Sequence, residues 1–119
     1  MFNVVKIGDK EVPMLSLASV DVYYQHIFHE DPLKVQTNAT DYSEAIGFYN
    51  RMGFVMAKFA ELKNRKDMAK LNEDMYLDWL DTFERTDYLA ALADIRMVYE
   101  GQQTTASDSK KNEEQQNEQ

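Results

Sequence analysis

Two histidines near the end of a predicted helix are the first residues whose types and spacing suggest chemistry. His26 and His29 are three positions apart, and Glu30 and Asp31 follow directly. Imidazole and carboxylate groups at such a spacing can bind zinc. The sequence indicates no third ligand, and Pro32 ends the helix just beyond. We therefore expect a structural role for both histidines, with His29 placed at the negative end of the helix dipole.

Three aspartates share one face of a helix predicted over residues 73–83; they are Asp74, Asp78 and Asp81. Carboxylates gathered in this way can hold a divalent cation. Trp79 and Phe83 fall on the opposite, apolar side of the same helix. This arrangement is typical of a solvated acidic face, which is the interpretation that we prefer to a cation site.

Apolar side chains on the helices are the remaining candidates, as contacts for a partner protein. The chain has seven methionines, whose flexible thioethers suit an adaptable surface, although ordinary core filling explains them more simply. Phe54 falls between polar positions on the wheel of its helix, and Met97 falls off the apolar stripe of its own helix. We predict a set of partner contacts made of Met52, Phe54, Met56, Phe59 and Met97.

The sequence shows none of the common catalytic patterns. It has no Ser-His-Asp order, no glycine-rich phosphate loop and no pair of carboxylates in an apolar setting. We therefore expect a protein that is not an enzyme and that uses no cofactor and no metal. A metal-dependent enzyme built on His26, His29 and nearby acids is the alternative.

The elements that carry these residues predict a mainly α fold of the α+β class. Residues 3–7 and 10–15 are typical of a β-hairpin across Gly8 and Asp9, with Pro13 on an edge strand. The spacing of apolar residues predicts about four helices, over residues 20–29, 41–63, 73–83 and 86–100. The expected caps of these helices are Ser19, Asp41 with Glu44, Asn72 and Gly101. Between the helices we expect a turn at residues 32–36 and a charged connector at 64–70.

The longest of these helices is the most informative. Its polar side holds Glu44, Gly47, Asn50, Arg51, Lys58 and Glu61, while apolar residues cover an arc of about 200°, roughly twice what a surface helix needs. The helix is therefore either the central strut of the bundle or a helix that presents an apolar flank to another chain. Its two glycines are expected at close helix packing.

The organisation and charge of the chain limit its partners. Residues 1–101 form one predicted domain, and residues 102–119 form a polar tail that is predicted to be disordered. The net charge is −8, and an acidic chain without a basic patch argues against nucleic-acid binding. No apolar run is long enough for a membrane span, and the first residues lack the order of a signal peptide. The lack of cysteine suits a reducing cytoplasm.

Three segments, in this order, resemble the tail assembly chaperones of long-tailed, siphovirus-type bacteriophages of Gram-positive hosts. They are KIGDKEVPMLSLASVDVYYQHIFHEDPLK, NEDMYLDWLDTFE and DYLAALADIRMVYEGQQTT, and with the long helix between the first two they cover nearly the whole chain. The chain departs from the pattern at His29, where a glycine is expected, and at Thr105-Ala106, where a Thr-Pro step is expected.

The resemblance implies a function in the cytoplasm of the bacterial host. Such proteins bind the long helical tape measure protein, keep it soluble, help to recruit tail tube subunits, and are absent from the finished virion. A −1 ribosomal frameshift often adds an extension that binds the tube protein. Lys110, Lys111 and Asn112 mark a possible frameshift region, because the codons AAA-AAA-AAC would contain a slippery heptamer. Lateral self-association on the rod is a further expectation.

A second function from the residues alone stays open. An acidic helical protein can act as an interaction partner or inhibitor of a host protein by occupying a basic groove. In this chain the ordered carboxylates are confined mainly to the face of Asp74, Asp78 and Asp81.

Overall fold

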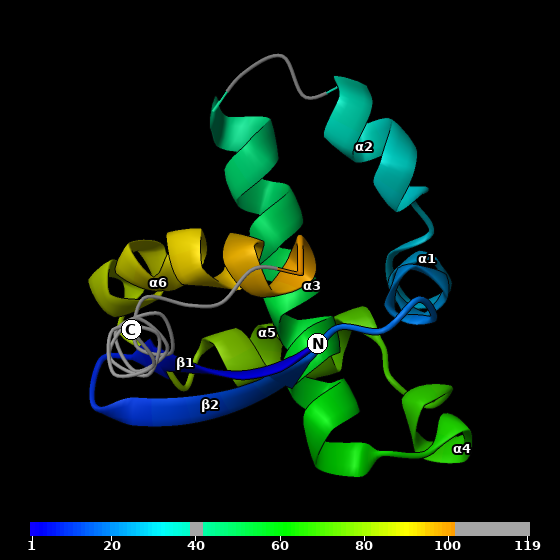
Figure 1. Ribbon diagram of the computed structural model, residues 1–119, viewed down its shortest axis with the longest axis horizontal. Helices are drawn as coiled ribbons and strands as arrows, with labels where there is room; N and C mark the ends of the chain where they lie inside the picture. The colour runs from blue at the N-terminus through cyan, green and yellow to red at the C-terminus, as the bar shows by residue number, and fades with distance from the viewer. Residues whose placement is uncertain (39–41, 102–119) are drawn as a thin grey trace, which may run out of the picture.

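The computed structural model describes residues 1–38 and 42–101 of the chain. A hairpin of β1 (Phe2–Ile7) and β2 (Lys10–Leu15) is followed by α1 (Val20–Phe28), α2 (Pro32–Asn38), α3 (Tyr42–Leu62), α4 (Arg65–Met68), α5 (Glu73–Leu80) and α6 (Arg85–Tyr99). This architecture confirms the predicted fold class, a mainly helical domain with an N-terminal hairpin (Figure 1). The predicted cap Asp41, the polar tail and the possible frameshift region lie outside the described residues.

The hairpin packs on the helices rather than standing alone. Its antiparallel register runs from Phe2 opposite Leu15 to Ile7 opposite Lys10, and Gly8 supplies the positive φ of 61° that the turn requires. Strand β1 lies against α6 and β2 lies against α3. A two-stranded sheet is marginal in water without such support, so the helices stabilise the hairpin.

Helix α3 is the central strut, which decides between the two alternatives for its wide apolar arc. It contacts β2 and each of the other helices, and Figure 1 shows it running through the middle of the molecule. Met52, Val55 and Met56 on this helix are fully buried, and they join the core with Tyr24 of α1 and Ile95 of α6. The apolar arc therefore faces the chain's own elements on several sides.

The structure corrects the predicted position of Phe54. The helical wheel places Phe54 on the polar side of its helix, but its side chain is 0% exposed. The reason is that α5 covers this side of α3, where the rings of Tyr76 and Trp79 lie with centroids 5.6 and 5.7 Å from that of Phe54. Arg51, also predicted on the polar side, is half-buried under α1, where it donates to the Tyr24 hydroxyl at 2.8 Å.

Two short helices replace segments that were predicted as a turn and a connector. Pro32 begins α2 rather than only ending the helix before it, and the Asp31 side chain accepts from the Leu33 amide at 3.0 Å. Proline suits the first position of a helix because its missing N–H would have no partner there. Within the connector, Asn64 caps the single turn of α4, whose Met68 is fully buried.

The helix ends show which predicted caps form. Asn72 accepts from the Met75 amide at 2.9 Å and caps α5 as predicted, and Gly101 follows α6 with a φ of 78°. The predicted Ser19 cap is wrong, because Ser19 is in the right-handed helical region and makes no side-chain cap bond. His29 ends α1 with a left-handed φ of 57°, which is the conformation that a glycine adopts most easily. Helix α5 ends at Leu80, earlier than predicted.

Candidate partner-binding grooves

Helix α5 is attached to the molecule by one side only, and none of its residues is fully buried. Tyr76 and Trp79 provide most of this attachment. Tyr76 packs edge-to-face on Phe28 of α1, with ring centroids 5.1 Å apart, and both aromatics pack on Phe54. Burial in these apolar surroundings raises the pKa of Tyr76 to about 12, because a buried phenolate would lose part of its hydration. Each flank of the helix borders a groove.

The first groove, here called the α4–α5 groove, is the more apolar of the two. It has a volume of about 530 Å³ and lies between the end of α3, α4 and α5. Its apolar lining residues are Leu62, Leu71, Met75 and Trp79, and its polar lining residues are Lys58, Asp67, Lys70, Asp78 and Thr82. Met75 is 43% exposed, whereas Leu71 is 7% exposed and forms part of the core. The groove thus has an apolar floor connected to the core and one adaptable thioether at its edge.

The rim of the α4–α5 groove carries both signs of charge. Lys58 pairs with Glu61 at 3.1 Å and Lys70 with Asp67 at 4.0 Å. Asp78 is exposed on α5. Mixed charges around an apolar floor match the amphipathic surface of a helix better than they match nucleic acid or a membrane.

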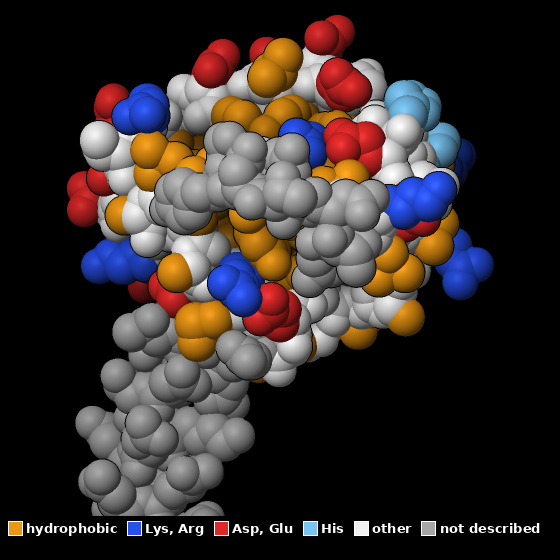
Figure 2. All heavy atoms as spheres, turned by 90° about the horizontal axis from the view of Figure 1, so that it is seen from above, with side chains coloured by type: hydrophobic (Ala, Val, Ile, Leu, Met, Phe, Trp, Pro, Cys, Tyr) orange, Lys and Arg blue, Asp and Glu red, His pale blue; other side chains and the backbone are white. Residues whose placement is uncertain are grey.

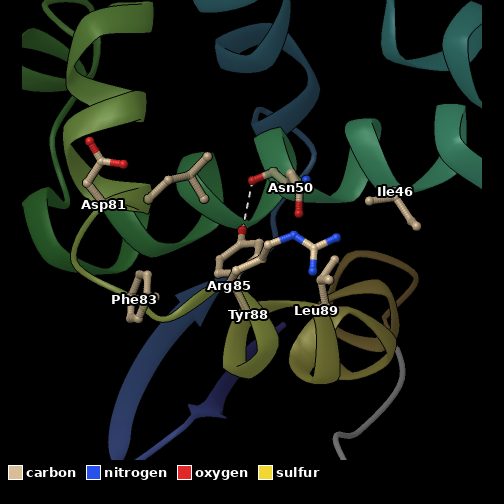
Figure 3. Close-up of a pocket in the computed structure, with 8 residues that line it drawn as sticks. Ile46, Asn50, Asp81, Phe83, Arg85, Tyr88 and Leu89 are labelled. Atoms are coloured by element: carbon tan, nitrogen blue, oxygen red, sulfur yellow. Dashed lines mark hydrogen bonds between the residues drawn. The ribbon is translucent and has the colours of Figure 1, made fainter.

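The second groove, here called the α5–α6 groove, lies between α3, the end of α5, the connector after it and the start of α6 (Figure 3). It has a volume of about 400 Å³ and is lined by Ile46, Asn50, Leu80, Asp81, Phe83, Arg85, Tyr88 and Leu89. Tyr88 is buried and donates from its hydroxyl to the backbone carbonyl of Asn50 at 2.8 Å. Burial also raises the pKa of Tyr88 well above its ordinary value.

The connector between α5 and α6 is fixed to the hairpin by one lysine. Lys10 donates from its ammonium to the carbonyl of Thr82 at 2.7 Å and lies 5.0 Å from the centre of the Phe83 ring. A cation above an aromatic face adds to the attraction. The hairpin turn therefore holds the end of α5 in place between the two grooves.

The structure divides the predicted partner-contact residues into two groups. Met52, Phe54 and Met56 are each 0% exposed, so these side chains belong to the core and lie on no surface of the folded domain. Phe59 and Met97 are half-buried, and Phe59 packs edge-to-face on Tyr23 with centroids 5.4 Å apart. Helix α3 is thus the support of the grooves, and α5 borders both of them.

Patterns in the sequence did not predict that three apolar residues would line one groove; they are Leu62, Leu71 and Met75. A signal for two of them was present, since Leu71 and Met75 are four residues apart across the cap Asn72. On the wheel of α5, Met75 also lies at the border between Trp79 and Asp78. Such a border position is where a half-exposed apolar residue is expected.

The histidines and aspartates singled out in the sequence were the predicted alternatives to partner binding. His26 is exposed and its Nε2 lies 3.1 Å from the carbonyl oxygen of Ala69, and His29 is the left-handed cap of α1. Asp74, Asp78 and Asp81 are exposed. Within residues 1–38 and 42–101, no group of three or more histidines or acids is arranged to hold a metal ion.

The surface charge is dispersed on the face shown in Figure 2. There, basic side chains of the described residues lie singly among acidic and apolar ones. Over the part of the chain that the structure describes, no helix combines the length and apolarity needed to cross a bilayer.

Compared with known proteins, the chain matches no protein-family model, no curated protein and no solved structure.

Proposed function

We propose that this protein is a bacteriophage tail assembly chaperone that binds and solubilises the tape measure protein in the cytoplasm of the host bacterium. It helps to recruit tail tube subunits and is absent from the finished virion. The observation that carries the proposal is the α4–α5 groove, which offers an open apolar floor on a small acidic domain. The order of the three resembling segments supports the same function.

The α4–α5 groove suits one turn or two of an amphipathic helix. Helices dock into such grooves through apolar anchors at positions i, i+3 or i+4 and i+7. Leu62, Leu71 and Trp79 provide a floor for these anchors, and Met75 adapts to anchors of different shape. A partner with many similar apolar turns in sequence, such as a long helical rod, would accept many copies of the chaperone.

The charge of the protein supports the solubilising part of the function. A long rod with an exposed apolar stripe aggregates unless it is covered. Each bound copy would cover part of the stripe and add a net charge of −8. Repulsion between such coated rods keeps them apart in solution.

A longer, frameshifted form is part of the proposal. Gly101, with its φ of 78°, follows the last described helix, so an extension from the residues beyond it would leave the core unchanged. In this form the extension would bind the tube protein while the grooves hold the tape measure protein. The gene sequence tests this point: other codons at Lys110, Lys111 and Asn112, or an immediate stop in the −1 frame, would exclude a frameshift there.

The exposed acids of α5 favour a second candidate function. Asp74, Asp78 and Asp81 are solvent-accessible on one helix face and would suit a basic groove of a host protein. Such an inhibitor would bind through charge, and its affinity would fall steeply as salt is added.

Co-expression separates the two functions. The tape measure protein encoded beside this gene is produced with and without the chain, and its soluble fraction is measured. We expect it to be soluble and to co-purify with the chain at 0.5 M salt, because apolar contacts are not screened. Equal solubility without the chain would exclude the chaperone function, and capture of a host protein only at low salt would support the inhibitor.

A further inference from the structure

The α5–α6 groove contains a hydrogen-bond acceptor that the fold does not use. Asn50 Oδ1 is buried and accepts no hydrogen bond from the described residues. The backbone carbonyl of the same residue, by contrast, accepts from the Tyr88 hydroxyl (Figure 3). Buried polar atoms are nearly always paired, so an unpaired one in the lining of a groove points to a ligand that brings a donor.

A cation faces the same groove from α6. Arg85 is exposed and forms no ion pair with the residues that the structure describes. The two lysines that line the α4–α5 groove are, by contrast, paired with acids: Lys58 with Glu61 and Lys70 with Asp67. The guanidinium of Arg85 is therefore available for a carboxylate, which it can hold through two parallel hydrogen bonds.

Apolar residues separate the two ends of the groove. Ile46, Leu80, Phe83 and Leu89 form its apolar lining, and Asp81 lies at the opposite end from the Arg85 guanidinium in Figure 3. The charges at the two ends would favour one orientation of a ligand with a single anionic end, with its negative group beside Arg85 and away from Asp81.

We propose that the α5–α6 groove binds the C-terminal residue of a peptide whose last side chain is apolar. The terminal carboxylate pairs with Arg85, the backbone N–H of the last residue donates to Asn50 Oδ1, and the side chain lies among the apolar lining residues. One C-terminal residue carries these three groups around a single Cα, whereas an internal acidic residue would supply the carboxylate but no apolar side chain. This site is separate from the α4–α5 groove and does not depend on the proposed chaperone function.

A peptide selection tests the site on the full chain. The probes are two pools of N-acetylated hexapeptides of random sequence that end in Leu, Ile, Val, Met or Phe, one with a free carboxylate and one amidated. The retained peptides are identified, and the strongest is titrated while the NMR signals of the Asn50 side-chain amide and the Arg85 Nε–H are followed. We expect saturable shifts of both signals with the free-acid peptide, and binding about tenfold weaker with its amide.

Variants distinguish this site from general charge attraction. Arg85→Gln is expected to weaken binding about tenfold, while Arg96→Gln, the same charge change further along α6, leaves it unchanged. Asn50→Leu is expected to weaken binding about fivefold with an equal or higher melting temperature, because it removes an unpaired buried acceptor. Equal retention of the two pools, no retention at all, or equal losses in the two arginine variants would overturn the proposal.

Discussion

Helices α3 and α5 lie against one another, yet the fold holds them in different ways. Helix α3 is enclosed by β2 and by the other helices, and its residues 52–57 are all buried. Helix α5 has no fully buried residue and is held through Tyr76 and Trp79 on one side. An enclosed helix determines stability, whereas a helix attached by one side leaves grooves on its flanks that a partner can enter.

Replacing one apolar residue on each helix gives the largest expected contrast. Phe54→Ala removes a ring that is 0% exposed and is expected to destabilise the protein by about 3–5 kcal/mol. Leu77→Ala on α5, where the side chain is 53% exposed, should change stability by less than about 0.5 kcal/mol. Urea denaturation measures both. Similar values for the two variants would contradict the difference between the helices.

Gly47 and Gly53 allow a tightly packed and an open position to be compared within α3. A Cβ at Gly53 would lie 2.6 Å from the Tyr88 hydroxyl oxygen and 3.2 Å from Ile95 Cδ1, so Gly53→Ala should cost about 1–3 kcal/mol. At Gly47 the nearest atom is Arg51 Nη1 at 3.3 Å, the end of a flexible side chain. Gly47→Ala should therefore stabilise the protein by up to about 1 kcal/mol.

Thermal unfolding of the two glycine variants gives the measurement. Opposite shifts in melting temperature are expected. An upward shift for Gly53→Ala would show that the packing of α6 on α3 near Gly53 is looser than the distances indicate, and a downward shift for Gly47→Ala would contradict the room at that position. The expectation of close helix packing at both glycines is thus met at Gly53, while Gly47 meets only a side chain of its own helix.

Much of the architecture was predictable from local signals. The hairpin, the Asn72 cap and the stop at Gly101 each depend on residues that are close in sequence, and all three form as predicted. Two local signals were misjudged: Pro32 starts α2 as well as ending the helix before it, and Ser19 does not make the expected cap bond.

The candidate site was less predictable, because it depends on how helices that are far apart in the sequence pack on one another. A helical wheel ranks Phe54 by its neighbours on its own helix, but α5 comes from later in the chain and covers it. The same placement of α5 creates the grooves around Met75 and Asn50. No periodicity within a single helix contains that information.

Removing a cap tests how firmly α5 is attached. Asn72→Ala removes the 2.9 Å bond to the Met75 amide and should cost about 1 kcal/mol. Ser19→Ala, at the start of α1, is the matched control and should change stability by less than about 0.5 kcal/mol, since Ser19 makes no cap bond. Hydrogen exchange should show faster opening of α5 in Asn72→Ala, whereas protection equal to that of the unaltered chain would contradict a weakly held α5.

Alkaline unfolding tests the burial of Tyr76 under α5. Burial raises the pKa of Tyr76 in the folded protein to about 12, above the value of about 10 in an unfolded chain. The neutral phenol therefore contributes its full stability below pH 10, and this contribution is lost as the pH rises through the folded pKa. Between pH 10 and 12 the free energy of unfolding should fall less steeply in Tyr76→Phe, and an unchanged slope would contradict the burial of the Tyr76 hydroxyl under α5.

The central claim is that the partner binds beside α5, in the α4–α5 groove. Met75 and Leu77 lie on the same helix and are 43% and 53% exposed, but only Met75 lines the groove. The soluble fraction of the co-expressed tape measure protein is therefore compared between Met75→Glu and Leu77→Glu. We predict that Met75→Glu loses the solubilising activity and that Leu77→Glu keeps it. Equal activity of the two variants, or loss in Leu77→Glu alone, would contradict the claim.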